Sequence, residues 1–90
     1  MDTILVVDDC KEDREIASRC LQEHGVKTLF AENGREALKI LAKQRLDAVL
    51  TDLHMPEMDG LQLVERMRLD YSNVPVVVMT AVGTAHAAAA

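Results

Sequence analysis

Short, mostly apolar runs alternate along the chain with longer segments in which apolar residues recur at helical spacing. A run of aliphatic residues suits a strand buried on both faces of a parallel sheet, and the runs predict strands at residues 4–7, 27–31, 48–51 and 76–79. The longer segments predict amphipathic helices over residues 11–24, 33–44 and 61–69. The predicted order is therefore strictly alternating and begins with a strand.

This alternation predicts an α/β domain in which a doubly wound parallel sheet carries helices on both faces. The 90 residues provide material for one domain, residues 1–90, and leave no room for a second. In sheets of this kind, functional groups gather at the carboxyl ends of the strands. The polar residues that follow each predicted strand are therefore the candidates for a site.

Each predicted helix has one face that we expect to pack on the sheet. The expected inward residues are Ile16, Ala17, Cys20 and Leu21 in the first helix, Ala37, Leu38 and Leu41 in the second, and Leu61, Val64 and Met67 or Arg68 in the third. Helix boundaries are also indicated, because Gly25 follows the first helix and Asn33 is placed to cap the second.

The net charge of −5, from 15 acidic and 10 basic residues, has the wrong sign for holding a polyphosphate backbone, so no direct nucleic-acid binding is expected. No apolar run approaches the roughly 20 residues that cross a bilayer, and Met1 leads into Asp2 without a basic stretch. We therefore expect a cytoplasmic chain with no membrane partner. Cys10 and Cys20 are predicted to be free thiols, and the acids beside Cys10 disfavour its thiolate.

Polar residues follow three of the predicted strands. Asp8 and Asp9 follow the first strand, Asp52 follows the third, and Thr80 follows the fourth. Adjacent acids alone are most often turn or cap residues. Carboxylates gathered at one sheet edge would repel one another, however, and a divalent cation removes that repulsion. An all-oxygen site suits Mg²⁺, which is commonly completed by phosphate. A metal-neutralised carboxylate can then act as the nucleophile that receives a phosphoryl group.

These residues and their surroundings resemble the receiver domain of two-component response regulators. The matching motifs are the Asp8-Asp9 pair, Asp52, the stretch MPEMDG at residues 55–60 and the stretch MTA at residues 79–81. Separated motifs in the right order make the resemblance specific, and it covers essentially the whole chain. It implies a flavodoxin-like doubly wound parallel sheet with strand order 2-1-3-4.

The resemblance also implies a role for each site residue. Asp52 would accept a phosphoryl group from a sensor histidine kinase or a phosphotransfer protein, and Thr80 would contact the bound group. Mg²⁺ would be held by Asp8, Asp9, Asp52 and the backbone carbonyl of His54. The His54 ring is expected at the rim of the site, because an oxygen-rich site selects a hard cation.

Further residues of the motifs are expected to shape the site. Pro56 fixes its own φ in the loop after Asp52, and Gly60 permits a tight start of the third helix. The resemblance implies that Ala81 leaves space for the phosphoryl group and its donor.

The chain departs from the family pattern at its C-terminal end. The family has five βα units, and this sequence stops at Ala90 within the fourth, so the resemblance implies a truncated receiver without the family's lysine and aromatic residue of strand five. Without the lysine, a charge-assisted contact to the phosphoryl group is lost and phosphate acceptance is expected to weaken. The strand at residues 76–79 is expected to be an open edge that favours a homodimer or strand exchange.

Two other functions fit parts of the pattern. An aspartyl phosphatase or phosphotransferase would use the same nucleophile, but it usually needs a second acid two residues further on, where His54 stands. A phosphorylation-impaired assembly module would act mainly through its exposed sheet edge. The favoured prediction is a signalling domain, with Asp52 as phosphoacceptor, rather than an enzyme with an external product.

Overall fold

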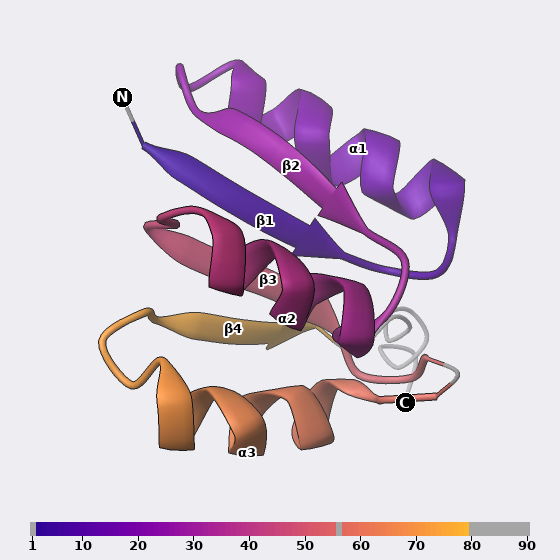
Figure 1. The fold of residues 1–90 in the computed structure, drawn as a ribbon. Helices are drawn as coiled ribbons and strands as arrows, with labels where there is room; N and C mark the ends of the chain where they lie inside the picture. Colours follow the sequence, from indigo (N-terminus) through magenta and orange to yellow (C-terminus); the bar gives the residue numbers. More distant parts are fainter. Residues whose placement is uncertain (1, 56, 80–90) are drawn as a thin grey trace.

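The computed structural model describes residues 2–55 and 57–79, which form a four-stranded sheet and its helices (Figure 1). The elements are β1 (Thr3–Val7), α1 (Lys11–Gln22), β2 (Lys27–Ala31), α2 (Gly34–Lys43), β3 (Ala48–Asp52), α3 (Gly60–Asp70) and β4 (Val76–Met79). Every predicted strand and helix is present, with ends that differ by at most two residues. None of the helices described has the length and apolar character that crossing a membrane requires.

The four strands are parallel and lie in the order β2-β1-β3-β4. This order confirms the prediction. β1 and β3 are the inner strands, and they are also the strands that end in the candidate acids. α1 covers one face of the sheet, while α2 and α3 cover the other (Figure 1). The domain is therefore doubly wound, as the alternation of elements predicts.

The hydrophobic core lies between the sheet and the layer formed by α2 and α3. Its buried residues are Leu5, Val7, Ala31, Ala37, Leu41, Leu46, Val49, Leu63 and Met67. In α2 the predicted inward face is confirmed, because Ala37 and Leu41 are buried and Leu38 packs against the cluster. This core fixes the positions of β1 and β3, whose ends carry the acids.

The predicted inward face of α3 is partly wrong. Leu61 is 60% exposed, and the buried positions are Gly60, Leu63 and Met67, with Val64 half-buried. The cause lies at the start of the helix, where Gly60 packs directly on the backbone of the preceding strand. That contact sets the rotation of α3, so the residues three and seven positions after Gly60 face the sheet.

The predicted inward face of α1 is also partly wrong. Ile16 is 58% exposed and Cys20 is exposed, whereas the buried side chain of the helix is Ser18. The Ser18 hydroxyl lies 3.2 Å from the Thr28 hydroxyl, and this hydrogen bond satisfies a polar group at the interface with β2. The spacing of apolar residues does not identify this face of α1, because its buried side chain is a serine that is hydrogen-bonded to β2.

α2 begins with the predicted Asn33 cap, in which Asn33 Oδ1 accepts the Glu36 N–H at 2.9 Å. Glu36 in turn accepts the Glu32 N–H at 3.0 Å. Replacing Asn33 with alanine is expected to lower the free energy of unfolding by about 1 kcal/mol, because the first turn loses an acceptor. Urea unfolding would measure the change, with Asn33→Asp as a control that keeps the cap. Equal losses in both variants would contradict the assignment.

Candidate functional site

The carboxyl ends of β1 and β3 meet at one edge of the sheet. Val7 pairs with Thr51 in the register of these neighbouring strands, so the next residues, Asp8 and Asp52, lie side by side. Both side chains are buried, at 4% and 6% exposure, whereas Asp9 is exposed. One carboxylate oxygen from each of the three acids lies within 4.8 Å of the others. The structure thus brings together the three acids that the sequence places at strand ends.

Asp8 is held by the start of α1. The Cys10 N–H donates a hydrogen bond to Asp8 Oδ1 at 2.9 Å, and the Arg14 guanidinium donates one to the Asp8 carbonyl oxygen at 2.7 Å. Burial raises the pKa of the Asp8 carboxyl; the bond from Cys10 lowers this pKa, and the charge of Asp52 raises it. Because the net shift is upward, the charged form of Asp8 is disfavoured in the metal-free cluster.

The cluster has the chemistry of a site for a hard divalent cation. In the described part of the chain, none of these three carboxylates forms an ion pair with a basic side chain; the ion pair found there joins Arg35 to Glu57. Three carboxylates, two of them buried, provide the oxygen ligands that Mg²⁺ prefers. A bound cation would also offset the repulsion within the cluster. The residues present therefore fit Mg²⁺.

Replacing Asp8 with asparagine is expected to raise the melting temperature of the metal-free protein. The amide oxygen can still accept the Cys10 N–H, while the buried charge is removed. Because the pKa of Asp8 is raised by folding, its ionisation lowers stability as the pH rises through the folded-state value. The gain from Asp8→Asn should therefore be largest near neutral pH and disappear in acid, where wild-type Asp8 is protonated.

Thermal melts in EDTA between about pH 3 and pH 8, a range that extends from below the ordinary carboxyl pKa of about 4 to well above it, would measure this effect. With Mg²⁺ present the order of stabilities should reverse, because the variant has lost a metal ligand. A variant that is less stable than the wild type in EDTA at neutral pH would contradict the expectation.

The backbone around Asp52 is closely constrained. The Leu53 N–H donates to Asp52 Oδ1 at 2.8 Å, and the Thr51 hydroxyl donates to the Asp52 carbonyl oxygen at 3.0 Å. The loop that follows closes on itself, because the Gly60 N–H donates to the Leu53 carbonyl at 2.9 Å. A Cβ on Gly60 would overlap the Asp52 carbonyl oxygen and lie 3.0 Å from Leu53 Cα. Glycine therefore lets α3 begin directly against the acidic edge.

The other predicted site residues are only partly described. His54 is exposed, at the rim of the loop that follows β3. Pro56, Thr80 and Ala81 lie outside the described residues, and their predicted roles remain predictions.

Sequence reasoning missed the contacts between this loop and the start of α2. Glu57 adopts a positive φ of 69°, and its carboxylate lies 3.8 Å from Arg35 Nε. Met58 packs against Gly34, the first residue of α2. In the sequence, only Gly34 could have indicated these contacts. A helix start tolerates most residues, so a glycine there can indicate that another segment approaches the backbone closely.

Cys10 does not have the environment of a reactive thiol. Both cysteines are free; Cys10 is half-buried and Cys20 is exposed. Hydrogen bonds from the backbone of Asp13 and Glu12 lower the pKa of the Cys10 thiol. Burial, the side-chain hydrogen bond to Glu12 and the negative charge of Asp13 outweigh them, so the net shift of this pKa is upward. The thiolate of Cys10 is therefore disfavoured, as the neighbouring acids predict.

The fold and the acidic edge define a doubly wound α/β domain with a carboxylate site at the ends of its two inner strands. The family model of the response regulator receiver domain matches residues 4–90. The chain belongs to the response regulator receiver domain family.

Named relatives agree with this membership. The chain is 42% identical to response regulator MprA of Mycolicibacterium vanbaalenii over 78 residues, which are 87% of this chain and 34% of that protein. It is 40% identical to sporulation initiation phosphotransferase F of Bacillus subtilis over 80 residues, 89% of this chain and 64% of that protein. The chain thus spans less than two thirds of the length of either relative.

Solved structures agree as well. Response regulator TrrA from Thermotoga maritima, in complex with Mg²⁺-BeF, matches with a TM-score of 0.87 and 38% identity over 90% of this chain and 70% of that chain. The chemotaxis response regulator CheY4 of Vibrio cholerae matches with a TM-score of 0.82 and 35% identity, over 87% and 67% of the two chains.

Proposed function

We propose that this chain is a phosphoacceptor domain of two-component signalling, with Asp52 as the acceptor and Mg²⁺ as the cofactor. The observation that carries the proposal is the cluster of Asp8, Asp9 and Asp52 at the carboxyl edge of a receiver-family sheet. The structure of the TrrA relative contains Mg²⁺, the cation that we propose for this cluster. A donor kinase that uses cellular ATP would place the exchange in the cytoplasm.

The proposed reaction transfers a phosphoryl group from a phosphohistidine on a sensor histidine kinase or a phosphotransfer protein. A carboxylate oxygen of Asp52 attacks phosphorus and forms the O–P bond of an acyl phosphate. The N–P bond breaks, and the leaving histidine keeps its electron pair and takes up a proton. Asp8, Asp9, Asp52 and the His54 carbonyl would hold Mg²⁺, which would offset the charge of the carboxylates and the phosphoryl oxygens. Thr80 would contact the bound group.

Intact mass spectrometry of the purified chain with acetyl phosphate tests this proposal. We expect one added phosphoryl group when Mg²⁺ is present and none in EDTA, because the metal-free carboxylates repel an anionic donor. A phosphorylated histidine kinase domain provides a second donor. A folded chain that binds Mg²⁺ and yet accepts phosphate from neither donor would overturn the proposal.

Receiver domains are signalling domains rather than enzymes with an external product. We therefore propose that the chain does not turn over external phosphate esters, and His54 stands where an aspartyl phosphatase would need its second acid. Release of phosphate from p-nitrophenyl phosphate, measured at many equivalents of substrate over protein, would argue instead for the enzymatic alternative.

A second candidate function, assembly through the sheet edge, has one specific observation in its favour. Among the described residues, β4 pairs with β3 on one side only, and Val77 in this strand is 56% exposed. Exposed apolar edge strands invite pairing with another chain. Light scattering over a range of concentrations, without phosphate donor, tests this candidate. Dimers that Val77→Lys converts to monomers would support it, and a wild-type monomer at all concentrations would exclude it.

A further inference from the structure

The loop between Asp52 and α3 is packed against the start of α2. Gly34 is buried as the first residue of α2, and Met58 belongs to the loop. A Cβ added at Gly34 would lie 2.7 Å from Met58 Cγ, 2.8 Å from Sδ and 2.9 Å from Cβ. All three distances are far below van der Waals contact, so no side chain fits at position 34 while Met58 keeps its place.

A change of the Met58 rotamer would not relieve this conflict. Rotation about χ1 moves Cγ and Sδ, but it leaves Cβ where the backbone puts it, and Cβ is itself within 2.9 Å of the added carbon. The backbone of the loop would therefore have to shift. Gly34 thus determines how closely the loop approaches α2.

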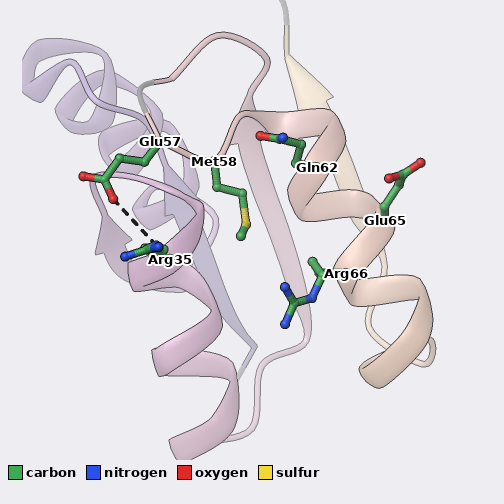
Figure 2. Close-up of a pocket in the computed structure, with 6 residues that line it drawn as sticks. All are labelled: Arg35, Glu57, Met58, Gln62, Glu65 and Arg66. Atoms are coloured by element: carbon green, nitrogen blue, oxygen red, sulfur yellow. Dashed lines mark ion pairs between the residues drawn. The ribbon is translucent and has the colours of Figure 1, made fainter.

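The loop has little freedom to absorb such a shift. Its ends are joined by the hydrogen bond from the Gly60 N–H to the Leu53 carbonyl, and Glu57 already has a positive φ. Figure 2 shows the Met58 side chain pointing into the groove between α2 and α3, next to the ion pair of Arg35 with Glu57. A displacement at Met58 is therefore transmitted to the part of the loop beside Asp52.

We infer that Gly34 and Met58 are positioning residues for the phosphoacceptor site. Their contact fixes the loop that carries the His54 carbonyl, the proposed metal ligand beside Asp52. Neither residue touches the reacting atoms. The inference rests on the proposed function and goes beyond it, because it gives a role in phosphoryl uptake to a helix start on the far side of the loop.

A double-mutant cycle tests the inference with Gly34→Ala, with Met58→Gly, which removes the Met58 Cβ, and with the variant that carries both changes. Gly34→Ala alone is expected to weaken Mg²⁺ binding and slow phosphoryl uptake from acetyl phosphate by about tenfold, because small displacements of a positioned group have large effects on rate. In the Met58→Gly background the Cβ, Cγ and Sδ atoms that the added methyl would meet are absent, so Gly34→Ala should have no further effect on either quantity.

The melting temperature is a further measurement in this cycle, and the effect of Gly34→Ala on it should have opposite signs in the two backgrounds. Alanine is a better helix former than glycine, so Gly34→Ala should raise the melting temperature once Met58 is replaced by glycine and lower it when Met58 is intact. Equal effects of Gly34→Ala in both backgrounds, on binding, uptake and melting, would overturn the inference. So would a Gly34→Ala variant that matches the wild type in all three.

Arg35→Ala is the matched control on the same helical turn. Arg35 is 72% exposed in its side chain and its ion pair with Glu57 is long, so its removal should leave Mg²⁺ affinity within about twofold of the wild type. A tenfold loss in this control would assign the positioning role to the ion pair and overturn the role of Gly34.

The two proposals fail in different ways. A wild-type chain that takes up no phosphate refutes the proposed function. The Gly34–Met58 contact can still be measured without metal or phosphate, from the amide NMR shifts of residues 53–55 and 57–60. Gly34→Ala should shift these amides in the presence of Met58 and leave them near their starting positions in the Met58→Gly background. Unshifted loop amides in both backgrounds would refute the positioning role independently.

Discussion

Replacing Asp52 with asparagine is expected to abolish phosphoryl uptake and to weaken Mg²⁺ binding by at least about tenfold. The amide offers no oxygen nucleophile comparable to the carboxylate, so no acyl phosphate forms. The change also removes one of the three negative charges of the cluster. Two unit charges about 4 Å apart interact with roughly 4 kcal/mol at an effective dielectric constant of about 20. This energy is more than a tenfold loss of Mg²⁺ affinity requires.

The same substitution should leave the chain folded and more stable without metal. The amide oxygen can replace Asp52 Oδ1 as acceptor of the Leu53 N–H, and the repulsion between positions 8 and 52 disappears. Intact mass spectrometry measures the loss of uptake, isothermal titration measures Mg²⁺ binding, and melting curves in EDTA measure stability. A stable variant that accepts no phosphate separates the chemistry of Asp52 from its structural role.

Asp59→Asn is the matched control, because it makes the same chemical change at the other end of the loop that follows Asp52. Asp59 caps α3 by accepting the Gln62 N–H at 2.9 Å, and asparagine caps helices equally well. Uptake should therefore be unchanged in this variant. Phosphate that is still accepted after Asp52→Asn would mean that a different acid is the acceptor.

Replacing Gly60 with alanine is expected to lower the free energy of unfolding by about 3 kcal/mol, at the upper end for an overpacked site. The added Cβ would meet the carbonyl oxygen of Asp52 and the Cα of Leu53, and neither backbone atom can move aside as a side-chain tip would. For a domain of this size the melting temperature should fall by more than about 10 °C. Mg²⁺ affinity should fall as well, because relief of the clash displaces Asp52.

Gly25→Ala provides the comparison for this prediction. Gly25 has a positive φ of 77°, and nothing lies within 4 Å of a Cβ placed there. Alanine at this position should therefore cost only about 1 kcal/mol of backbone strain and leave Mg²⁺ binding unchanged. Equal losses of stability and of metal affinity in the two variants would contradict the assignment of Gly60 as the closer contact.

The strands and α2 could be predicted because burial there is almost purely apolar. Val49 and Leu41 occupy positions that periodicity alone identifies, and both are in the core. The faces of the other two helices depend on groups that periodicity does not register. α1 packs through Ser18, whose hydroxyl is paired with Thr28, and the rotation of α3 is set by the approach of Gly60 to a carbonyl. Both features are tertiary contacts that a local pattern does not contain.

The acidic cluster was accessible to sequence reasoning for a topological reason. Parallel strands end at the same edge, so acids that follow β1 and β3 must meet once the strand order is known. The contacts that hold the cluster and its loop in place could not be predicted from the sequence. The bond from Arg14 to the Asp8 carbonyl and the packing of Met58 on Gly34 depend on where side chains meet across the fold.

The helices hold the sheet with unequal strength. α1 buries one side chain, Ser18, whereas α2 and α3 each bury three residues. Local unfolding is drawn from elements with few buried apolar side chains, so we expect the amides of α1 to exchange with solvent faster than those of α2. Its first turn carries the groups that hold Asp8, while Asp52 is anchored to α3. Thermal fluctuations of the native state should therefore displace Asp8, which α1 holds, more than Asp52, which is anchored to α3.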